Sequence, residues 1–298
     1  MDDQQSQSQA HAPLSYTGAM ERAAALLAQD GPDVSSASRT QLMTHGARVE
    51  SAAVLLHGYT SSPPQFARLG AALYDLGYNV LIPRAPHHGL ADRLTGEQAR
   101  LTVAELVAYA TEALDVARGL GEQVTVAGLS MGAVLAGWAA HHRPDVARAM
   151  LMAPAFGLRF IAPALTPLSA ALLHAAPNVF VWWDPRTRER IAGPQHAYPR
   201  LATRGLGHIL ALSAAVRGRA KQVRPVAGSI VVVTNASDRA VSNTATARVV
   251  AGWRRHGASL HTYEFPAELR LGHDFVDPAQ PHERTDIVYP VLVELLSR

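Results

Sequence analysis

The sequence predicts an α/β fold, in which a doubly wound, mostly parallel sheet carries helices on both faces. Three observations support this prediction. The chain has 298 residues, 48% of them hydrophobic, which is enough to bury one large core. Short apolar runs alternate with helical stripes along most of the chain, the order that builds parallel sheets. A segment at about 155–205 interrupts this order, and we interpret it as an inserted cap rather than a second domain.

The individual elements are predicted from apolar runs and cap signals. The runs typical of buried strands cover residues 51–57, 79–83, 123–127, 148–153, 229–234 and 259–265. Helical spacing predicts helices over residues 18–29, 63–76, 102–118, 131–142, 206–217, 242–257 and 283–297. Two of the predicted helices begin with a recognisable N-cap signal. Ser62 is the expected N-cap of the second helix, with Pro63 in its first turn, and Thr102 and Glu105 have the spacing of a capping box.

The organisation predicted is an N-terminal extension over residues 1–40 and a main domain over 41–298 that carries the cap. Residues 1 to about 12 are rich in Gln and Ser, so we expect disorder there. The start of the chain lacks the basic and apolar segments of a signal peptide, and no apolar stretch is long enough for a membrane span. We expect a cytoplasmic protein without an integral membrane segment. Secretion with a trimmed signal peptide is the alternative.

Composition excludes several classes of function. The formal net charge is +3, and the basic residues are scattered rather than clustered, so we expect no nucleic-acid partner. There is no cysteine, which removes thiolate metal ligands and redox chemistry. The pairs His87-His88 and His141-His142 lack the further ligands that zinc requires, and no glycine-rich phosphate loop is present. We therefore expect neither a metal nor a cofactor.

The pentapeptide Gly-Leu-Ser-Met-Gly at 128–132 lies between a predicted strand and a helix of small residues. It has the G-x-S-x-G pattern of a nucleophile elbow, in which a sharp turn lifts the serine hydroxyl above the sheet. Glycine on either side of the serine allows the neighbouring elements to approach closely. The pattern alone is common in ordinary turns, but its position between strand and helix indicates that Ser130 is a nucleophile.

Two further segments supply partners for Ser130. Asp238 follows the fifth predicted strand, and His273 lies in the loop after the last one. An imidazole there can act as general base while the carboxylate holds its tautomer. The alternatives are an aspartate that caps a turn and a solvent-exposed histidine, and Asp274 or Asp277 would be the acid if Asp238 is not.

An oxyanion hole is expected where His57-Gly58-Tyr59 ends the first strong strand. Backbone N–H groups aimed at a carbonyl oxygen stabilise the negative charge that develops during nucleophilic attack. We assign the N–H groups of Tyr59 and Met131 to this role. The alternative is an ordinary glycine turn after a strand.

Taken together, these motifs resemble those of α/β-hydrolase-fold serine esterases, in the branch that contains bacterial carboxylesterases and monoacylglycerol lipases. The resemblance covers roughly residues 50–298. It is carried by Leu-Leu-His57-Gly58, the stretch Pro-Arg-Ala-Pro-His-His-Gly at 83–89, the elbow, Asp238 with Val241, and Gly272-His273-Asp274. Two departures are His87, where that branch usually has glycine, and Thr60-Ser61-Ser62, where many relatives have a second glycine.

The resemblance implies a Ser130–His273–Asp238 triad, an oxyanion hole, no cofactor, and a cap after the strand that ends near Ala153. We predict hydrolysis of a small-molecule carboxylic ester. An amidase, thioesterase or C–C bond hydrolase on the same triad is the alternative, as is a ligand-binding receptor on the same scaffold. Tyr59, Phe156 and Phe160 are expected to line the substrate pocket, and the alternative for the two phenylalanines is a small core within the cap.

Overall fold

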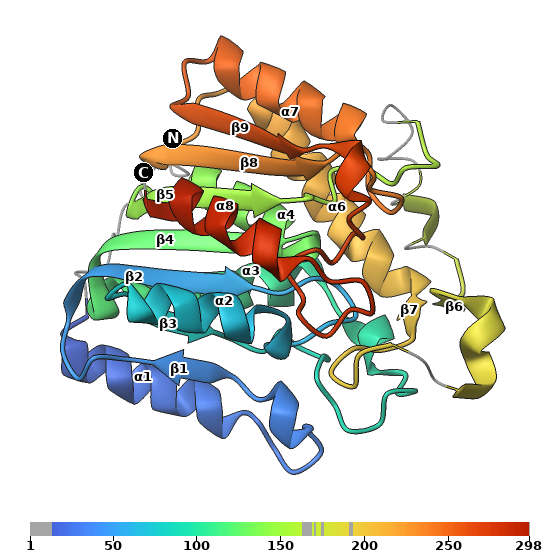
Figure 1. Cartoon of the computed structure of the whole chain (residues 1–298), viewed down its shortest axis with the longest axis horizontal. Coiled ribbons are helices and arrows are strands. Elements are labelled where there is room, and N and C mark those ends of the chain that lie inside the picture. Colours follow the sequence, from blue (N-terminus) through green and yellow to red (C-terminus); the bar gives the residue numbers. More distant parts are fainter. Residues whose placement is uncertain (1–13, 163–168, 170, 174–175, 191–192, 298) are drawn as a thin grey trace, which may run out of the picture.

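The computed structural model describes residues 14–162, 169, 171–173, 176–190 and 193–297. The disorder predicted for residues 1 to about 12 lies outside the described residues. A seven-stranded sheet with the order β1-β3-β2-β4-β5-β8-β9 runs through the protein (Figure 1). Its strands are β1 (Gln41–Met43), β2 (Val49–Leu56), β3 (Asn79–Ile82), β4 (Gly121–Leu129), β5 (Val146–Met152), β8 (Ser229–Asn235) and β9 (Leu260–Phe265).

All neighbouring strands of this sheet pair in parallel, except that β1 is antiparallel to β3. The helices that accompany it are α1 (Tyr16–Ala28), α2 (Pro64–Asp75), α3 (Val103–Leu120), α4 (Met131–His142), α6 (Thr203–Ala220), α7 (Asn243–Arg255) and α8 (Thr285–Ser297). The 3-10 helices are η1 (Ser36–Ser38), η2 (Glu97–Arg100), η4 (Pro185–Arg190) and η5 (Ala267–Leu269). The predicted α/β class and mostly parallel sheet are confirmed.

The chain reverses its direction across the sheet at β2. Strand β3 lies on one side of β2 and β4 on the other, so the right-handed crossovers through α2 and α3 cover opposite faces. Helix α2 contacts α8, whereas α3 contacts α1 and α4. In open α/β sheets the crevice at such a switch point, at the carboxyl ends of the strands, is where ligands bind. The carboxyl ends of β2 and β4 therefore mark the place to look for a site.

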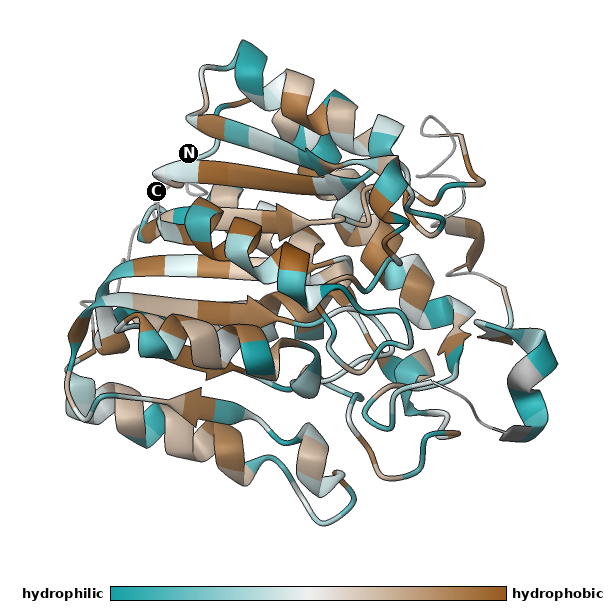
Figure 2. Cartoon of the chain, in the orientation of Figure 1, coloured by the Kyte–Doolittle hydropathy of each residue, from teal (hydrophilic) through white to brown (hydrophobic). Residues whose placement is uncertain are grey.

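The core is formed by the strands and by one almost completely buried helix. Figure 2 shows the central strands as predominantly hydrophobic and η4 as hydrophilic. In α4 every residue except Trp138 and His142 is buried, and most of them are Ala, Gly or Val. Small side chains let this helix pack directly on the sheet, which places its N-terminus firmly at the end of β4.

Residues 14–40 of the N-terminal extension pack onto the main domain. Arg22 of α1 forms two hydrogen bonds with Glu112 of α3, at 3.0 and 2.7 Å. The buried Asp30 pairs with Arg84 in the loop after β3, with Nε and Oδ1 2.5 Å apart, and also accepts the Thr40 N–H. These contacts attach the extension to helix α3 and to the loop that follows β3.

The segment predicted to be a cap, residues 155–205, contains a small antiparallel sheet of β6 (Phe180–Trp182) and β7 (Arg200–Ala202), with η4 between them in the sequence. Figure 1 shows it at one end of the molecule, beyond the carboxyl ends of the central strands. The three-residue strands β1, β6 and β7 were not predicted, because so short a run carries too little pattern. Within the described part of the chain, no helix is both long enough and apolar enough to cross a membrane.

Of the two predicted N-caps, the structure confirms one and contradicts the other. The capping box is confirmed, since the Thr102 side chain accepts the Glu105 N–H and Glu105 accepts the Thr102 N–H. The prediction for Ser62 was wrong, because Pro63 occupies the N-cap position of α2. The Ser62 hydroxyl instead donates to the carbonyl of His196 in the cap, at 2.8 Å. A tertiary contact thus replaces the local one that the sequence indicated.

Candidate functional site

Ser130 lies in a sharp turn between β4 and α4. Its backbone is left-handed, with φ 57° and ψ −107°, a conformation that costs energy for any residue other than glycine. The Ser130 N–H donates to the Met152 carbonyl at the end of β5, at 2.9 Å. A Cβ added to Gly128 would overlap the backbone of Gly132, and one added to Gly132 would overlap the Leu56 carbonyl. Both glycines are therefore required by the close packing of the turn.

Asp238 and His273 come together from the loops after β8 and β9. Nδ1 of His273 lies 2.7 Å from Oδ2 of Asp238. The other carboxylate oxygen of Asp238 accepts the N–H groups of Ala240 and Val241, at 2.8 and 3.0 Å. Because Nδ1–H points at the carboxylate, Nε2 is the ring nitrogen left to exchange a proton with another group.

The electrostatics of this pair favour the charged forms. Burial acts to raise the pKa of Asp238, but the hydrogen bond and charge of His273 and the two N–H donors outweigh it, and the pKa is lowered. For His273, burial acts to lower the pKa, while the hydrogen bond and charge of Asp238 raise it, and the net pKa is raised. A carboxylate that stays ionised beside a readily protonated imidazole is the arrangement that a general base needs.

Two backbone N–H groups are positioned beside Ser130. Strands β2 and β4 are direct neighbours, so Gly58 and Tyr59 lie next to the elbow, and a Cβ added to Gly58 would be 3.7 Å from Cβ of Ser130. Met131 is the first residue of α4, where a helix leaves its N–H groups unpaired. Among the described residues, none accepts a hydrogen bond from the N–H of Tyr59 or Met131. Both groups are open to a ligand.

The fully buried His57 sets the direction of the Tyr59 N–H. Its Nε2 accepts the Ala85 N–H at 3.0 Å, so the proton is on Nδ1, which donates to the Gly58 carbonyl at 2.9 Å. Burial lowers the pKa of His57 well below its ordinary value, which keeps the ring neutral. In a trans peptide the C=O and the following N–H point in opposite directions, so holding the Gly58 carbonyl turns the Tyr59 N–H outward. No motif in the sequence predicts this role for the His57 side chain.

A family model described as "Serine aminopeptidase, S33" matches residues 47–265. The chain belongs to this family. A thermostable monoacylglycerol lipase from Bacillus sp. (strain H-257) is 30% identical over 113 residues, which are 38% of this chain and 44% of that protein. The aligned segment therefore spans less than half the length of that curated relative.

Solved structures of low identity share the fold of this S33 family member. One chain, from work on the metagenome-derived lipolytic enzymes LipS and LipT, has a TM-score of 0.67 and 18% identity, covering 89% of this chain and 99% of that chain. The monoacylglycerol lipase of Paleococcus ferrophilus has a TM-score of 0.64 and 16% identity, with coverages of 86% and 97%. A soluble variant of the Saccharomyces cerevisiae monoglyceride lipase has a TM-score of 0.63 and 13% identity, covering 87% of this chain and 89% of that chain. The predicted resemblance to α/β-hydrolases is confirmed.

Four hydrogen bonds between described residues join the cap of the S33 family member to the loop after β2. The Trp183 Nε1–H donates to Thr60 Oγ1 at 3.0 Å, and the Tyr198 N–H donates to the Thr60 carbonyl at 2.7 Å. The Tyr59 hydroxyl donates to the Ala202 carbonyl at 2.9 Å, and the fourth bond is that of Ser62 described above. Thr60 has φ 68°, a left-handed conformation that the sequence does not signal. We call residues 58–62, which include the predicted oxyanion donor Tyr59, the oxyanion loop.

The three residues predicted to line a substrate pocket have different environments. Phe156 is fully buried and packs edge-to-face on Trp253, with ring centroids 6.2 Å apart, so it belongs to the core of the domain rather than to an open pocket. Phe160 is 88% exposed on the surface of the cap segment. Tyr59 is partly buried, with its hydroxyl bonded to β7. Pocket lining remains a prediction for Tyr59 and Phe160.

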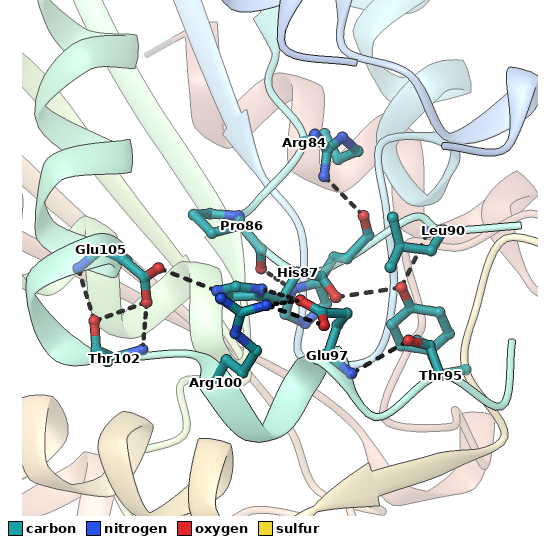
Figure 3. Close-up of polar contacts among 11 residues, drawn as sticks. Arg84, Pro86, His87, Leu90, Thr95, Glu97, Arg100, Thr102 and Glu105 are labelled. Carbon is teal, nitrogen blue, oxygen red and sulfur yellow. Dashed lines mark hydrogen bonds and ion pairs between the residues drawn. The ribbon is translucent and has the colours of Figure 1, made fainter. Parts of the chain in front are cut away.

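The histidine pairs have structural partners. The buried His141 accepts the indole N–H of Trp253 at 2.8 Å. His87 lies between two carboxylates, with Nδ1 3.1 Å from Glu97 and Nε2 3.0 Å from Glu105 (Figure 3). Burial acts to raise the pKa of Glu105, but hydrogen bonds from Thr102 and His87 lower it overall. Over the described residues, no group of three or more potential ligands is placed to hold a metal ion.

Proposed function

We propose that this S33 family member is a serine hydrolase that cleaves carboxylic esters through a Ser130–His273–Asp238 triad. The observation that carries the proposal is the hydrogen-bonded pair of the buried Asp238 and the partly buried His273, at the same edge of the sheet as an elbow serine flanked by two open N–H groups. This set contains a general base with its orienting acid, a nucleophile and a place for an oxyanion, which are the groups that acyl transfer needs.

In the proposed mechanism, Ser130 Oγ attacks the ester carbonyl carbon while Nε2 of His273 takes its proton. The carbonyl oxygen becomes negative and accepts hydrogen bonds from the N–H groups of Tyr59 and Met131. The imidazolium returns its proton to the leaving alcohol oxygen as the carbon–oxygen bond breaks, which leaves an acyl group on Ser130. Water, deprotonated by the same imidazole, then attacks the acyl carbon. The bond between that carbon and Ser130 Oγ breaks, the imidazolium returns the proton to Oγ, and the acid is released.

The comparisons support ester substrates. The curated relative is described as a monoacylglycerol lipase, and two of the similar solved structures as a monoacylglycerol and a monoglyceride lipase. The family description also contains the word aminopeptidase, so amides are the competing substrate class. Large apolar side chains exposed on the cap, such as Phe160 and Val181, are more compatible with an apolar acyl or alcohol group than with a charged peptide terminus.

The test is a panel of p-nitrophenyl and glyceryl esters of graded acyl length, run beside matching amides and thioesters. We expect the wild type to prefer esters and Ser130→Ala to lower kcat by about four to six orders of magnitude. Because the Ser130 side chain makes no cap hydrogen bond in α4, the variant should melt at the wild-type temperature. Ester turnover that survives in Ser130→Ala would contradict the mechanism, and faster amide cleavage would contradict the substrate class. Covalent labelling by a fluorophosphonate, absent in Ser130→Ala, provides a second readout.

A further inference from the structure

We propose that Gln65 is a positioning residue that connects the oxyanion loop to the loop carrying His273. The inference rests on the proposed function, because it assigns Gln65 the task of keeping the oxyanion donors and the general base in one fixed arrangement. Among the described residues, the Gln65 side chain forms hydrogen bonds with Gly58 and Asp274 and none with Ser130, Asp238 or His273. Nothing in the motifs of the sequence indicates this glutamine.

The side-chain amide of Gln65 binds one group on each loop. Oε1 accepts the Gly58 N–H at 2.8 Å, and Nε2 donates to Oδ1 of Asp274 at 3.1 Å. The partners settle the orientation of the amide, since a backbone N–H can only donate and a carboxylate can only accept. Gln65 is 1% exposed, so water cannot replace either hydrogen bond without a rearrangement.

Gln65 is held rigidly by its place in the fold. It is in the first turn of α2, directly after Pro64, and its own N–H donates to the Ser62 carbonyl at 3.1 Å. The helix begins where the oxyanion loop ends, so the glutamine reaches back across the loop to its first residue. Together with His57, which holds the Gly58 carbonyl, Gln65 fixes both peptide groups that flank Gly58. The second of these peptides carries the Tyr59 N–H.

Asp274, the other partner, directly follows His273 and lies in a strongly acidic environment. Burial raises the pKa of Asp274, and the charges of Asp277 and Asp238 raise it further, although His273 acts the other way. Within the described residues, Gln65 is the one hydrogen-bond donor to this carboxylate. Asp277 has a different partner, His196 of the cap, with Nε2 and Oδ2 3.1 Å apart. The amide of Gln65 thus holds Asp274, and with it the neighbouring His273 segment of the loop after β9, against the oxyanion loop.

The connection gives Gln65→Glu a distinctive pH dependence. While the introduced carboxyl group is protonated, it can still accept the Gly58 N–H and donate its proton to Asp274, as the amide does. Once that shared proton is lost, two adjacent carboxylates repel each other and the loops separate. We therefore expect kcat of Gln65→Glu to approach the wild-type value near pH 6 and to fall about tenfold to a hundredfold below it toward pH 9. Gln65→Leu removes both hydrogen bonds and should lose a similar factor at every pH.

The double variant Gln65→Glu/Asp274→Asn reverses the polarity of the bridge. The introduced carboxylate then accepts both the Gly58 N–H and an N–H of the introduced asparagine amide, so the alkaline loss should disappear. Gln280→Glu is the matched control, because Gln280 donates to Asp277 at 3.1 Å in the same loop but does not reach the oxyanion loop. It also places a glutamate beside an aspartate, and its ratio to wild type should not vary with pH. Thermal melting at each pH identifies any loss that comes from unfolding.

Two results would overturn the inference: a Gln65→Glu variant that follows the wild type at every pH, or a double variant no better than Gln65→Glu at alkaline pH. The proposed function is decided separately, by wild-type ester turnover and its loss in Ser130→Ala. The rate of fluorophosphonate labelling supplies the same variant-to-wild-type ratios without depending on the choice of ester.

Discussion

The elbow and the cap are held at the candidate site by different means. Around the elbow, contact is steric, because the glycines at 128 and 132 touch backbone atoms of neighbouring elements and α4 is buried along almost its whole length. The cap instead exposes large apolar side chains, among them Phe160 and Trp183, and is attached to the oxyanion loop through hydrogen bonds.

This difference separates two kinds of sensitivity. Close packing in a buried turn cannot relax, so a single added methyl group should disrupt both the fold and the site. A hydrogen bond from a half-exposed side chain can be replaced by water at little cost in stability, but the loop it positions then samples other arrangements. Added volume at the elbow glycines should therefore cost stability and activity together, and changes to the hydrogen bonds of the cap should cost activity alone.

The largest effect is expected for Gly132→Ala. The new Cβ would overlap the Leu56 carbonyl, a backbone atom of the neighbouring strand, so either β2 or α4 has to move. We expect a loss of more than about 3 kcal/mol of unfolding free energy, measured by urea denaturation, and little soluble active protein. Gly218→Ala is the control, since a Cβ there meets no atom within 4 Å inside α6, and alanine should leave stability unchanged or raise it by about 0.5–1 kcal/mol. Equal stability of the two variants would contradict the steric account.

Asp238→Asn should leave the fold intact and reduce kcat about ten-thousandfold, because an amide cannot hold the required tautomer of His273. The pH profile of activity provides an independent test, because the direction of its shift can be predicted. Asp238 raises the pKa of His273, and activity requires the neutral imidazole, so removing the carboxylate should shift the acid limb of kcat/KM to lower pH. A limb that stays in place, or a small loss in kcat, would indicate that Asp274 or Asp277 is the orienting acid.

The sequence predicts the elbow side of the site well and the cap side poorly, for physical reasons. The turn at Ser130 depends on local chemistry, a strand, two glycines and a small-residue helix, all visible within about a dozen residues. The oxyanion loop depends on contacts between residues more than 100 positions apart, such as Thr60 with Trp183. No local pattern reports such contacts. The same cause underlies the wrong assignment of Ser62, whose hydroxyl reaches the cap instead of its own helix.

Two aromatic residues of the cap segment show that burial in an irregular segment is also hard to predict from the sequence. Phe156 and Phe160 lie four positions apart in a segment without periodicity, and composition treats them alike. One is fully buried against Trp253, and the other is 88% exposed. Burial in an irregular segment is decided by what packs on it, which only the tertiary structure contains.

Trp183→Phe tests how the cap is attached, and its expected effect on kcat is smaller than that of Asp238→Asn. The substitution keeps an aromatic ring but removes the indole N–H that binds Thr60, and the side chain is 55% exposed. We expect kcat on a short-chain ester to fall about threefold to tenfold while the melting temperature stays within about 2 °C of wild type. Val181→Ala, at a 46% exposed position in β6, should leave kcat unchanged. A drop in melting temperature that accounts for the loss of activity would show that the cap is held by packing after all.

The smallest effect concerns His87, which lies in the loop between β3 and η2 and has φ 63°. Both of its ring nitrogens face carboxylates, Nδ1 that of Glu97 and Nε2 that of Glu105 (Figure 3). His87→Ala loses both contacts and keeps the left-handed backbone, so we expect a loss of about 1 kcal/mol of unfolding free energy. His87→Gly loses the same contacts but relieves the backbone, and should be more stable than the alanine variant by about 1 kcal/mol.

Urea denaturation of wild type and of both His87 variants measures these differences. An alanine variant as stable as wild type would mean that the contacts with Glu97 and Glu105 contribute nothing to stability. Equal stability of the alanine and glycine variants would mean instead that the left-handed backbone at this position costs no free energy.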